Sequence, residues 1–136
     1  MNEDVKIIIN YRIEKAIKSL DEAEYLINGN MWNLTVNRLY YSCYYSIIAL
    51  LLCIEQSPKT HKGARNLFHQ HFIATGIFKY EFGELLTILF DARQEGDYKD
   101  FVEFDSSDVL PWINLTKEFV KSISQFIYSN YFNIDK

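Results

Sequence analysis

The sequence predicts an all-α protein, an up-and-down bundle of about five helices. Apolar residues recur at offsets of three and four through most of the 136 residues, which is the period of a helix buried on one side. Only two prolines and five glycines interrupt the chain, leaving room for long helices and few turns. Strand-like alternation of polar and apolar residues is absent over any useful length. Helices with one apolar stripe each are expected to pack around a single core.

Two long helices are predicted in the N-terminal part. The first ends near Gly29-Asn30, where a left-handed cap forms easily. The second runs from about Trp32 to Glu55 and is apolar nearly all round after Cys43, which is typical of a helix at the centre of a bundle. The buried stripe of the first helix comprises Ile9, Ile13, Ala16, Leu20, Ala23 and Ile27.

Three further helices are predicted after Ser57-Pro58. One starts near Thr60, a suitable N-cap, and ends before Gly76. The next covers about 79–95 and is followed by an irregular stretch over 96–107. The last opens with residues 106–108, has Pro111 in its first turn, and buries apolar residues from Trp112 to Ile127.

Length and composition predict one domain over residues 1–136, because a chain of this size can form a single core. Cys43 and Cys53 fall ten residues apart on one predicted helix, roughly 15 Å and beyond disulfide reach. They are expected to be buried thiols of a reducing compartment. The sequence shows no secretory signal and no apolar run long enough for a membrane span. We therefore expect a cytoplasmic protein without a membrane partner.

Charge is distributed unevenly along the chain. Residues 81–108 contain nine acidic and two basic residues, a balance of −7, whereas residues 1–80 contain nine basic and seven acidic ones. The acidic block argues against a broad nucleic-acid surface there and favours a basic protein partner. Lys59, His61, Lys62 and Arg65 gather at the predicted start of the third helix. They form either a small anion site or a solvated helix start.

The start of the second helix is a candidate ligand site. Arg38, Tyr41 and Tyr45 share one stripe, and a charged group on a helix otherwise made for the core needs a partner or a ligand. Arginine beside aromatic faces suits a base and a phosphate, with Lys62 as a further phosphate ligand. The alternative is a central helix whose hydroxyl groups are satisfied by neighbouring backbone.

Other chemistry finds less support in the sequence. His69 and His71 lie about 200° apart on a helix, and no glycine-rich phosphate loop, CxxC pair or nucleophile elbow occurs. We therefore predict no metal site and no cofactor. Arg93 and Asp97, offset by four, share a helix face, and Tyr98 follows directly. Either Arg93 and Asp97 form a surface ion pair with Tyr98 beside them, or the three residues line a pocket.

A family resemblance runs through most of the chain. Asn37-Arg38-Leu39-Tyr40-Tyr41 is followed in order by Thr60-His61-Lys62-Gly63, by Leu67-Phe68 with His71-Phe72, and by Arg93 with Gly96-Asp97-Tyr98 and Phe101. This order resembles the HEPN domain proteins of prokaryotes, most of all the small stand-alone branch often found beside a minimal nucleotidyltransferase. The resemblance implies a helical bundle that forms a homodimer. It also implies, in many members, a metal-independent RNase site made of an arginine, a polar residue and a histidine four to six positions after the arginine.

The expected RNase motif is incomplete in this chain. Arg93 stands where the motif arginine normally falls, but Asp97 and Tyr98 follow it and the histidine is missing. A carboxylate cannot replace an imidazole near neutral pH unless its pKa is strongly raised. A literal match, Arg65-Asn66 with His71, occurs one helix earlier, with its arginine and histidine about 120° apart.

Three functional hypotheses follow. The first is a HEPN-like binding and regulatory module with a degenerate RNase centre. It would be a homo-oligomer and a component of a toxin–antitoxin or defence pair with a nucleotidyltransferase. The second is an active metal-independent ribonuclease toxin that uses Arg93 or Arg65 with His71 or His69. The third is a nucleotide-binding bundle whose pocket is lined by Arg38, Tyr41 and Tyr45.

Overall fold

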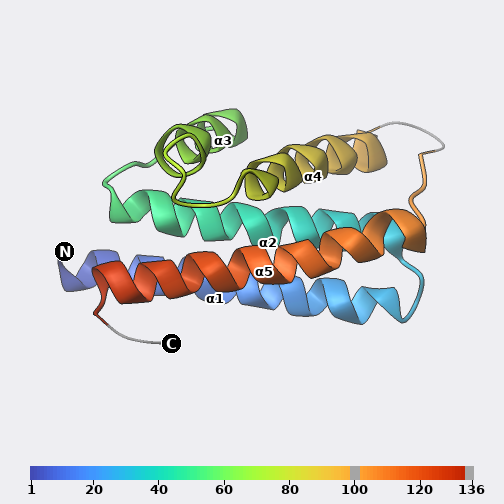
Figure 1. Cartoon of the computed structure of the whole chain (residues 1–136). Coiled ribbons are helices and arrows are strands. Elements are labelled where there is room, and N and C mark those ends of the chain that lie inside the picture. The colour runs from blue at the N-terminus through green and yellow to red at the C-terminus, as the bar shows by residue number, and fades with distance from the viewer. Residues whose placement is uncertain (99–101, 134–136) are drawn as a thin grey trace.

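The computed structural model describes residues 1–98 and 102–133, and every regular element in this part is helical (Figure 1). The predicted all-α class is therefore confirmed. The elements are α1 (Glu3–Ile27), α2 (Trp32–Cys53), α3 (His61–Phe68), the π-helical segment η1 (His69–Ile73), α4 (Tyr80–Tyr98) and α5 (Ser106–Tyr131).

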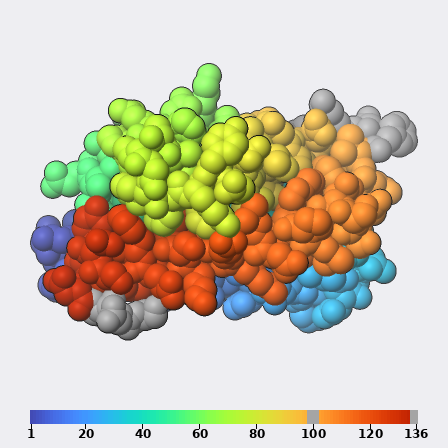
Figure 2. All heavy atoms as spheres, in the orientation of Figure 1, coloured from blue at the N-terminus to red at the C-terminus, as the bar shows by residue number. Residues whose placement is uncertain are grey.

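Helix α2 lies at the centre of the bundle, as predicted. Helices α1, α2 and α5 run side by side, while α3, η1 and α4 lie on the other side of α2 (Figure 1). Helix α2 contacts each of the other four α-helices. It is buried nearly all round because its residues Val36, Leu39, Cys43, Ile47, Leu50 and Leu51 face different neighbours. Figure 2 shows α5 covering one face of the molecule, with η1 and α4 beside it.

Helix ends follow the local sequence. The side chain of Asn2 accepts a hydrogen bond from the Val5 N–H at the start of α1, and Thr60 caps α3 in the same way through Gly63 N–H. Beyond α1, Asn30 adopts the predicted left-handed conformation with φ 55°. Asp105 and Asp108 form a reciprocal capping box at α5. Pro111 lies in the second turn of α5, one turn later than predicted.

Two stretches depart from the predicted boundaries. The third helix changes to π-helical geometry at His69, and α4 continues to Tyr98 although a helix end was expected near residue 95. Gly96 is helical, and a Cβ there would lie 3.2 Å from Phe104 and 3.5 Å from the Asn33 amide. Asn33 donates to the Val102 carbonyl at 2.8 Å and accepts from the Phe104 N–H at 3.0 Å. Because Gly96 has no side chain, the segment before α5 can lie close to both the start of α2 and the end of α4.

Polar groups inside the bundle are paired along the α1–α2 contact. The buried Ser42 hydroxyl donates to the Ala16 carbonyl at 2.7 Å, which ties α2 to α1 at this level. Cys43 and Cys53 are both buried free thiols, as expected, and burial raises the pKa of each, that of Cys53 to about 12. None of the described helices is long and apolar enough to cross a membrane.

Candidate functional site

His61, the first residue of α3, contacts two tyrosines of α2. Its Nδ1 lies 2.5 Å from the Tyr40 hydroxyl oxygen, and its ring stacks on Tyr44 with centroids 4.3 Å apart. Tyr40 is fully buried, and burial raises the pKa of its hydroxyl, which therefore keeps its proton. No other acceptor for that proton is seen among the described residues. We infer that Tyr40 donates to Nδ1, so that the imidazole carries its own hydrogen on Nε2.

Arg93 of α4 lies beside the same tyrosines. Its guanidinium is 4.9 Å from the Tyr40 ring centroid and 5.6 Å from that of Tyr41, and Nη1 donates to the Tyr41 hydroxyl at 3.3 Å. The side chain is only 11% exposed, and its Asp97 partner is 4.0 Å away. Buried guanidinium groups need such partners, and aromatic faces supply part of that stabilisation.

Arg65 of α3 approaches the site from the other side. Its guanidinium lies 4.2 Å from the Phe90 ring centroid, and that of Arg93 lies 5.6 Å from the same ring. Both Nε atoms are buried without a hydrogen-bond partner among the described residues. Asp97 pairs with Arg93, whereas Arg65 forms no ion pair with any described residue. We call Tyr40, Tyr41, Tyr44, His61, Arg65, Phe90 and Arg93 together the Arg93 cluster.

Electrostatics within the Arg93 cluster favour binding of an anion. Burial lowers the pKa of His61, and the nearby Arg93 charge lowers it further, so the imidazole is neutral near pH 7. The site then offers two guanidinium groups and an imidazole N–H, all of which donate hydrogen bonds. Lys62 follows His61 on the first turn of α3, where it is exposed. Such a set of donors suits the oxygens of a phosphate group.

The structure places the predicted Arg93–Asp97–Tyr98 group at the end of α4. The Asp97 carboxylate approaches Arg93 and also accepts from the Asn37 amide at 3.4 Å. Asp97 is thus engaged by two donors from different helices. Tyr98 ends α4, but its side chain lies outside the described part of the chain, as does Phe101.

Arg38, Tyr41 and Tyr45 also come together. The Arg38 guanidinium lies 5.2 Å from the Tyr41 ring, and the Tyr41 and Tyr45 rings are 6.0 Å apart. Arg38 pairs with Glu22 at 3.6 Å across the α1–α2 contact. Because Tyr41 contacts both Arg38 and Arg93, the two sites predicted separately from the sequence form one continuous surface.

The literal motif of Arg65 with His71 is not brought together by any contact in the described residues. Arg65 faces Phe90 of α4, whereas His69 lines a small hollow with Tyr80 and Gly83 at the start of that helix. The His71 carbonyl accepts from the Thr75 hydroxyl at 2.8 Å, a contact local to the end of η1. The geometry therefore favours Arg93 as the centre of the site.

Sequence reasoning did not name Tyr40, Tyr44 or Phe90 as site residues. It placed His61 in a candidate anion site at the start of the third helix, with a solvated helix start as the alternative. A signal did exist, because a histidine directly after a helix cap has its side chain placed by that cap. The sequence does not reveal that Arg93 lies near this imidazole, since the two residues are 32 positions apart.

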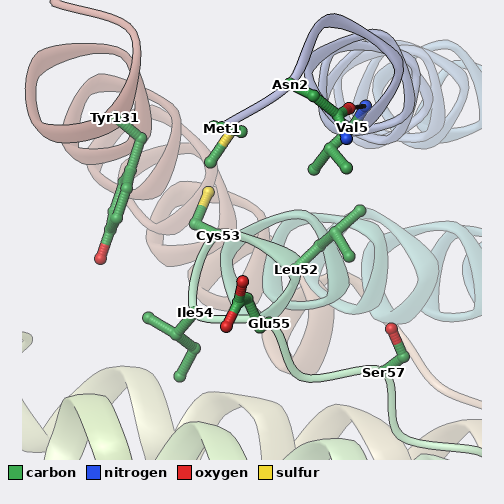
Figure 3. A pocket seen from close by; sticks show the side chains of 9 residues that line it. All are labelled: Met1, Asn2, Val5, Leu52, Cys53, Ile54, Glu55, Ser57 and Tyr131. Atoms are coloured by element: carbon green, nitrogen blue, oxygen red, sulfur yellow. Dashed lines mark hydrogen bonds between the residues drawn. The ribbon is translucent and has the colours of Figure 1, made fainter.

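A separate hollow of about 610 Å³ opens at the end of the bundle where α1 begins and α2 ends (Figure 3). Met1, Val5, Cys53 and Tyr131 line it with mostly apolar surface, and none of the predicted site residues borders it. Nor do three metal-ligating side chains gather anywhere in the described residues.

Fold and site together define a small helical-bundle protein with a cationic–aromatic cluster between its central helix and the α3–α4 layer. The chain belongs to the HEPN domain family, which matches residues 9–126. It is 35% identical over 127 residues to a UPF0332 protein of Thermotoga maritima, covering 93% of this chain and 96% of that protein. It is also 32% identical over 117 residues to a Methanocaldococcus jannaschii protein named "Putative toxin", covering 86% and 80% of the two chains. A second protein of that organism with the same type of name is 31% identical over 98 residues, 72% of this chain and 73% of its own.

Proposed function

We propose that this protein is the toxin-type component of a toxin–antitoxin or defence pair, and that it binds RNA by holding a phosphate at the Arg93 cluster. The observation that carries the proposal is the convergence of Arg65, Arg93 and the His61 N–H within an otherwise acidic chain. The toxin names of two relatives from another organism support the same class of function.

The physical case rests on an incomplete balance of charge. Asp97 pairs with Arg93 at 4.0 Å and is shared with Asn37, whereas Arg65 has no ion-pair partner among the described residues. A phosphodiester would add the second negative charge and accept hydrogen bonds from several donors at once. The surrounding tyrosine and phenylalanine rings keep water away from the arginines, which strengthens their attraction to an anion.

The same geometry supports a binding role over cleavage. Asp97 stands where the family resemblance leads one to expect a histidine, and its carboxylate is engaged by Arg93 and Asn37. With both contacts made, this carboxylate is held by its partners and not aimed at a leaving group. The cleavage centre is therefore degenerate, and the protein acts as a binding and regulatory module.

Binding of a labelled single-stranded RNA, followed by fluorescence anisotropy, tests this proposal. Arg93→Gln and Arg65→Gln should each weaken binding about tenfold or more, because each removes a charge-assisted contact to phosphate. Lys121→Gln, which removes an exposed cation on α5, is the matched control. RNA affinity that is unaffected by both arginine substitutions would overturn the proposal.

The proposed partner is a minimal nucleotidyltransferase, and the proposed assembly is a homodimer or larger in the cytoplasm. The exposed carboxylates between Glu81 and Asp108 suit a basic partner surface, which they would steer into contact. Co-purification with a nucleotidyltransferase from the same genome tests the pairing, and sedimentation of the chain alone tests the assembly. A monomeric protein that binds neither the transferase nor RNA would contradict this proposal.

One observation favours a second candidate function, an active metal-independent ribonuclease. The neutral His61 imidazole lies close enough to Arg93 for that charge to lower its pKa, so an imidazole and an arginine do meet in space. As a general base, His61 would take the 2′-hydroxyl proton at Nε2, which requires Nδ1 to carry the hydrogen and Tyr40 to accept it. Cleavage that persists in EDTA, leaves cyclic phosphate ends and is lost in His61→Ala but not in His71→Ala would establish this candidate.

A further inference from the structure

A row of cations and tyrosines continues from the Arg93 cluster along the outer face of the α1–α2 pair. The Lys15 ammonium lies 5.0 Å from the Tyr45 ring centroid and 5.4 Å from that of Tyr11. Tyr45 is 6.0 Å from Tyr41, whose ring also contacts Arg38. We call Tyr11, Lys15, Tyr45, Tyr41 and Arg38 the tyrosine track.

The aromatic rings of the tyrosine track remain open to solvent. Tyr11 is 57% exposed, and Tyr41 and Tyr45 are half-buried although they lie on the central helix of the bundle. On α2 these positions follow the offsets three and four that face one side of a helix. Tyr41 lies at the edge of this side, where Arg93 of α4 donates to its hydroxyl, whereas Tyr45 is contacted by Lys15 of α1.

The charge along this face is favourable for a polyanion. Glu22 pairs with Arg38 at 3.6 Å, and Asp21 lines the hollow beside them together with Lys18. Two other carboxylates of α1 point toward α5. Glu24 pairs with Lys117, and burial and then the charge of Glu14 raise the pKa of Tyr128. At the end of the track remote from Arg38, the Arg12 guanidinium donates to the Ile48 carbonyl and lies close to Tyr44. A local excess of cations in a chain of net charge −4 is thus concentrated where the rings are exposed.

We propose that the tyrosine track binds the single strand of RNA that leads away from a phosphate held at the Arg93 cluster, with bases stacked on Tyr41, Tyr45 and Tyr11. Aromatic faces alternating with cations are how proteins hold single strands without reading their sequence. From Arg38 to the level of Ile48 the track extends roughly 15 Å along α2, which is about four nucleotides at 3.4 Å each. The inference rests on the proposed RNA-binding function and adds the form of RNA that is recognised.

Comparing two lengths of RNA tests the track separately from the Arg93 cluster. The probes are fluorescein-labelled oligouridylates of three and twelve nucleotides, which do not fold. Tyr11→Ala and Tyr45→Leu should each weaken binding of the twelve-mer about tenfold, because stacking of one base is lost. Binding of the three-mer should be unchanged. Lys15→Gln should reduce the slope of log affinity against log salt by about 0.7.

Controls match the substitutions in residue type. Tyr80→Ala removes a tyrosine that is 63% exposed on α4, and Lys121→Gln removes an exposed lysine of α5. Both should bind the twelve-mer as the parent protein does. Thermal melting of every variant shows whether it is folded. Tyr11 is the variant least able to disturb the core because more than half of its surface is already exposed.

The outcomes separate the two proposals. If Arg93→Gln weakens both probes and the track variants weaken the long one alone, the track is established. If Arg93→Gln weakens binding but all three track variants bind the twelve-mer like the parent, the track is overturned and the proposed function stands. If Arg93→Gln has no effect, or the parent binds neither probe, the proposed function itself fails. If the track variants change the sedimenting mass of the protein, the face is covered by a second copy of the chain and the track is overturned.

Discussion

At the scale of single residues, the contact between Tyr40 and His61 organises the site. The tyrosine is fully buried and its hydroxyl approaches the imidazole Nδ1 at 2.5 Å. A hydrogen bond of this kind fixes the orientation of the ring as well as its tautomer. Through it, a side chain of the core determines which way a surface imidazole presents its other nitrogen.

Replacing this hydroxyl should weaken both stability and binding. Tyr40→Phe leaves Nδ1 without its partner in a half-buried position, and we expect a loss of about 1 kcal/mol in the free energy of unfolding. RNA affinity should also fall, because the imidazole is no longer held. Urea unfolding and anisotropy measure the two effects. Tyr25→Phe, at a tyrosine that is 77% exposed, is the control, and equal stability of the two variants would refute the prediction.

His61 should also make stability depend on pH. Burial, and then the Arg93 charge, hold its pKa in the folded protein below the usual value of about 6.5. Between these two pKa values the unfolded chain binds a proton that the folded chain does not. The contribution of His61 to the free energy of unfolding is therefore fully present above about pH 6.5. It is lost as the pH falls toward the pKa of His61 in the folded protein.

Urea unfolding at pH 7.5 and at pH 5.5 measures this dependence. The parent protein should lose more stability between the two conditions than His61→Gln does, because glutamine does not titrate. Arg93→Gln should lie between them, since it removes the second cause of the shift but not the first. Identical pH dependence in the parent protein and His61→Gln would show that the imidazole is not the responsible group.

At the scale of elements, the start of α3 delivers the imidazole to the site. The Thr60 hydroxyl accepts from the Gly63 N–H at 2.9 Å and so fixes where α3 begins. His61 is the next residue, and its position depends on that cap. The segment shows how a local sequence signal, the threonine cap, controls a tertiary contact with α2.

Removing the cap should therefore affect function as well as folding. Thr60→Ala is expected to reduce the free energy of unfolding by about 1 kcal/mol and to weaken RNA binding, because the first turn of α3 frays. Thr60→Ser keeps a hydroxyl that caps the helix and should behave like the parent protein. An alanine variant that binds RNA with unchanged affinity would show that the cap does not position His61.

Helix positions could be predicted from the sequence because each depends on residues close together in the chain. The stripe from Ile9 to Ile27 and the Thr60 cap are local patterns. The cap is confirmed, and the stripe is buried except at Leu20 and Ile27, which are partly buried against the core. The end of α4 was placed too early because Gly96 normally stops a helix. The contact of Gly96 with Asn33 and Phe104, which explains its place in the helix, joins segments far apart in the sequence. The π-helical geometry of η1 has no sequence signal that we can identify.

The site could be predicted only in pieces. Arg93 with Asp97, and Arg38 with Tyr41, were found because helical spacing relates each pair. The meeting of Tyr40, His61 and Arg93 comes from three helices, and no periodicity within one segment relates residues on different helices. Their approach is set by how α3 and α4 pack on α2, which the sequence specifies only through the whole core.

At the scale of the whole molecule, α4 separates two regions of opposite charge. Glu81, Glu84, Asp91 and Glu95 are exposed and share one face of the helix, because their offsets of three, seven and four return to the same side. Phe90, Arg93 and Asp97 lie on the other side, toward α2 and α3. An acidic surface and the proposed phosphate-binding cluster can therefore coexist on one helix without cancelling.

Reversing the acidic face should affect protein association alone. The triple change Glu81→Lys, Glu84→Lys and Asp91→Lys is expected to slow association with a nucleotidyltransferase from the same genome and to reduce the dependence of that rate on salt. Surface plasmon resonance at two salt concentrations measures both. Reversal of the exposed Glu3 and Asp4 on α1 is the control. An unchanged association rate would remove this face from the interface.

The buried thiols on α2 have a practical consequence. Cys43 is fully buried and burial raises the pKa of its thiol, so it does not present the thiolate that alkylating reagents attack, whereas Cys53 borders the hollow at the end of the bundle. Modification of Cys43 must wait until the helix that contacts all the others is uncovered. The rate at which such a reagent labels Cys43 in the native protein therefore measures how often the bundle opens.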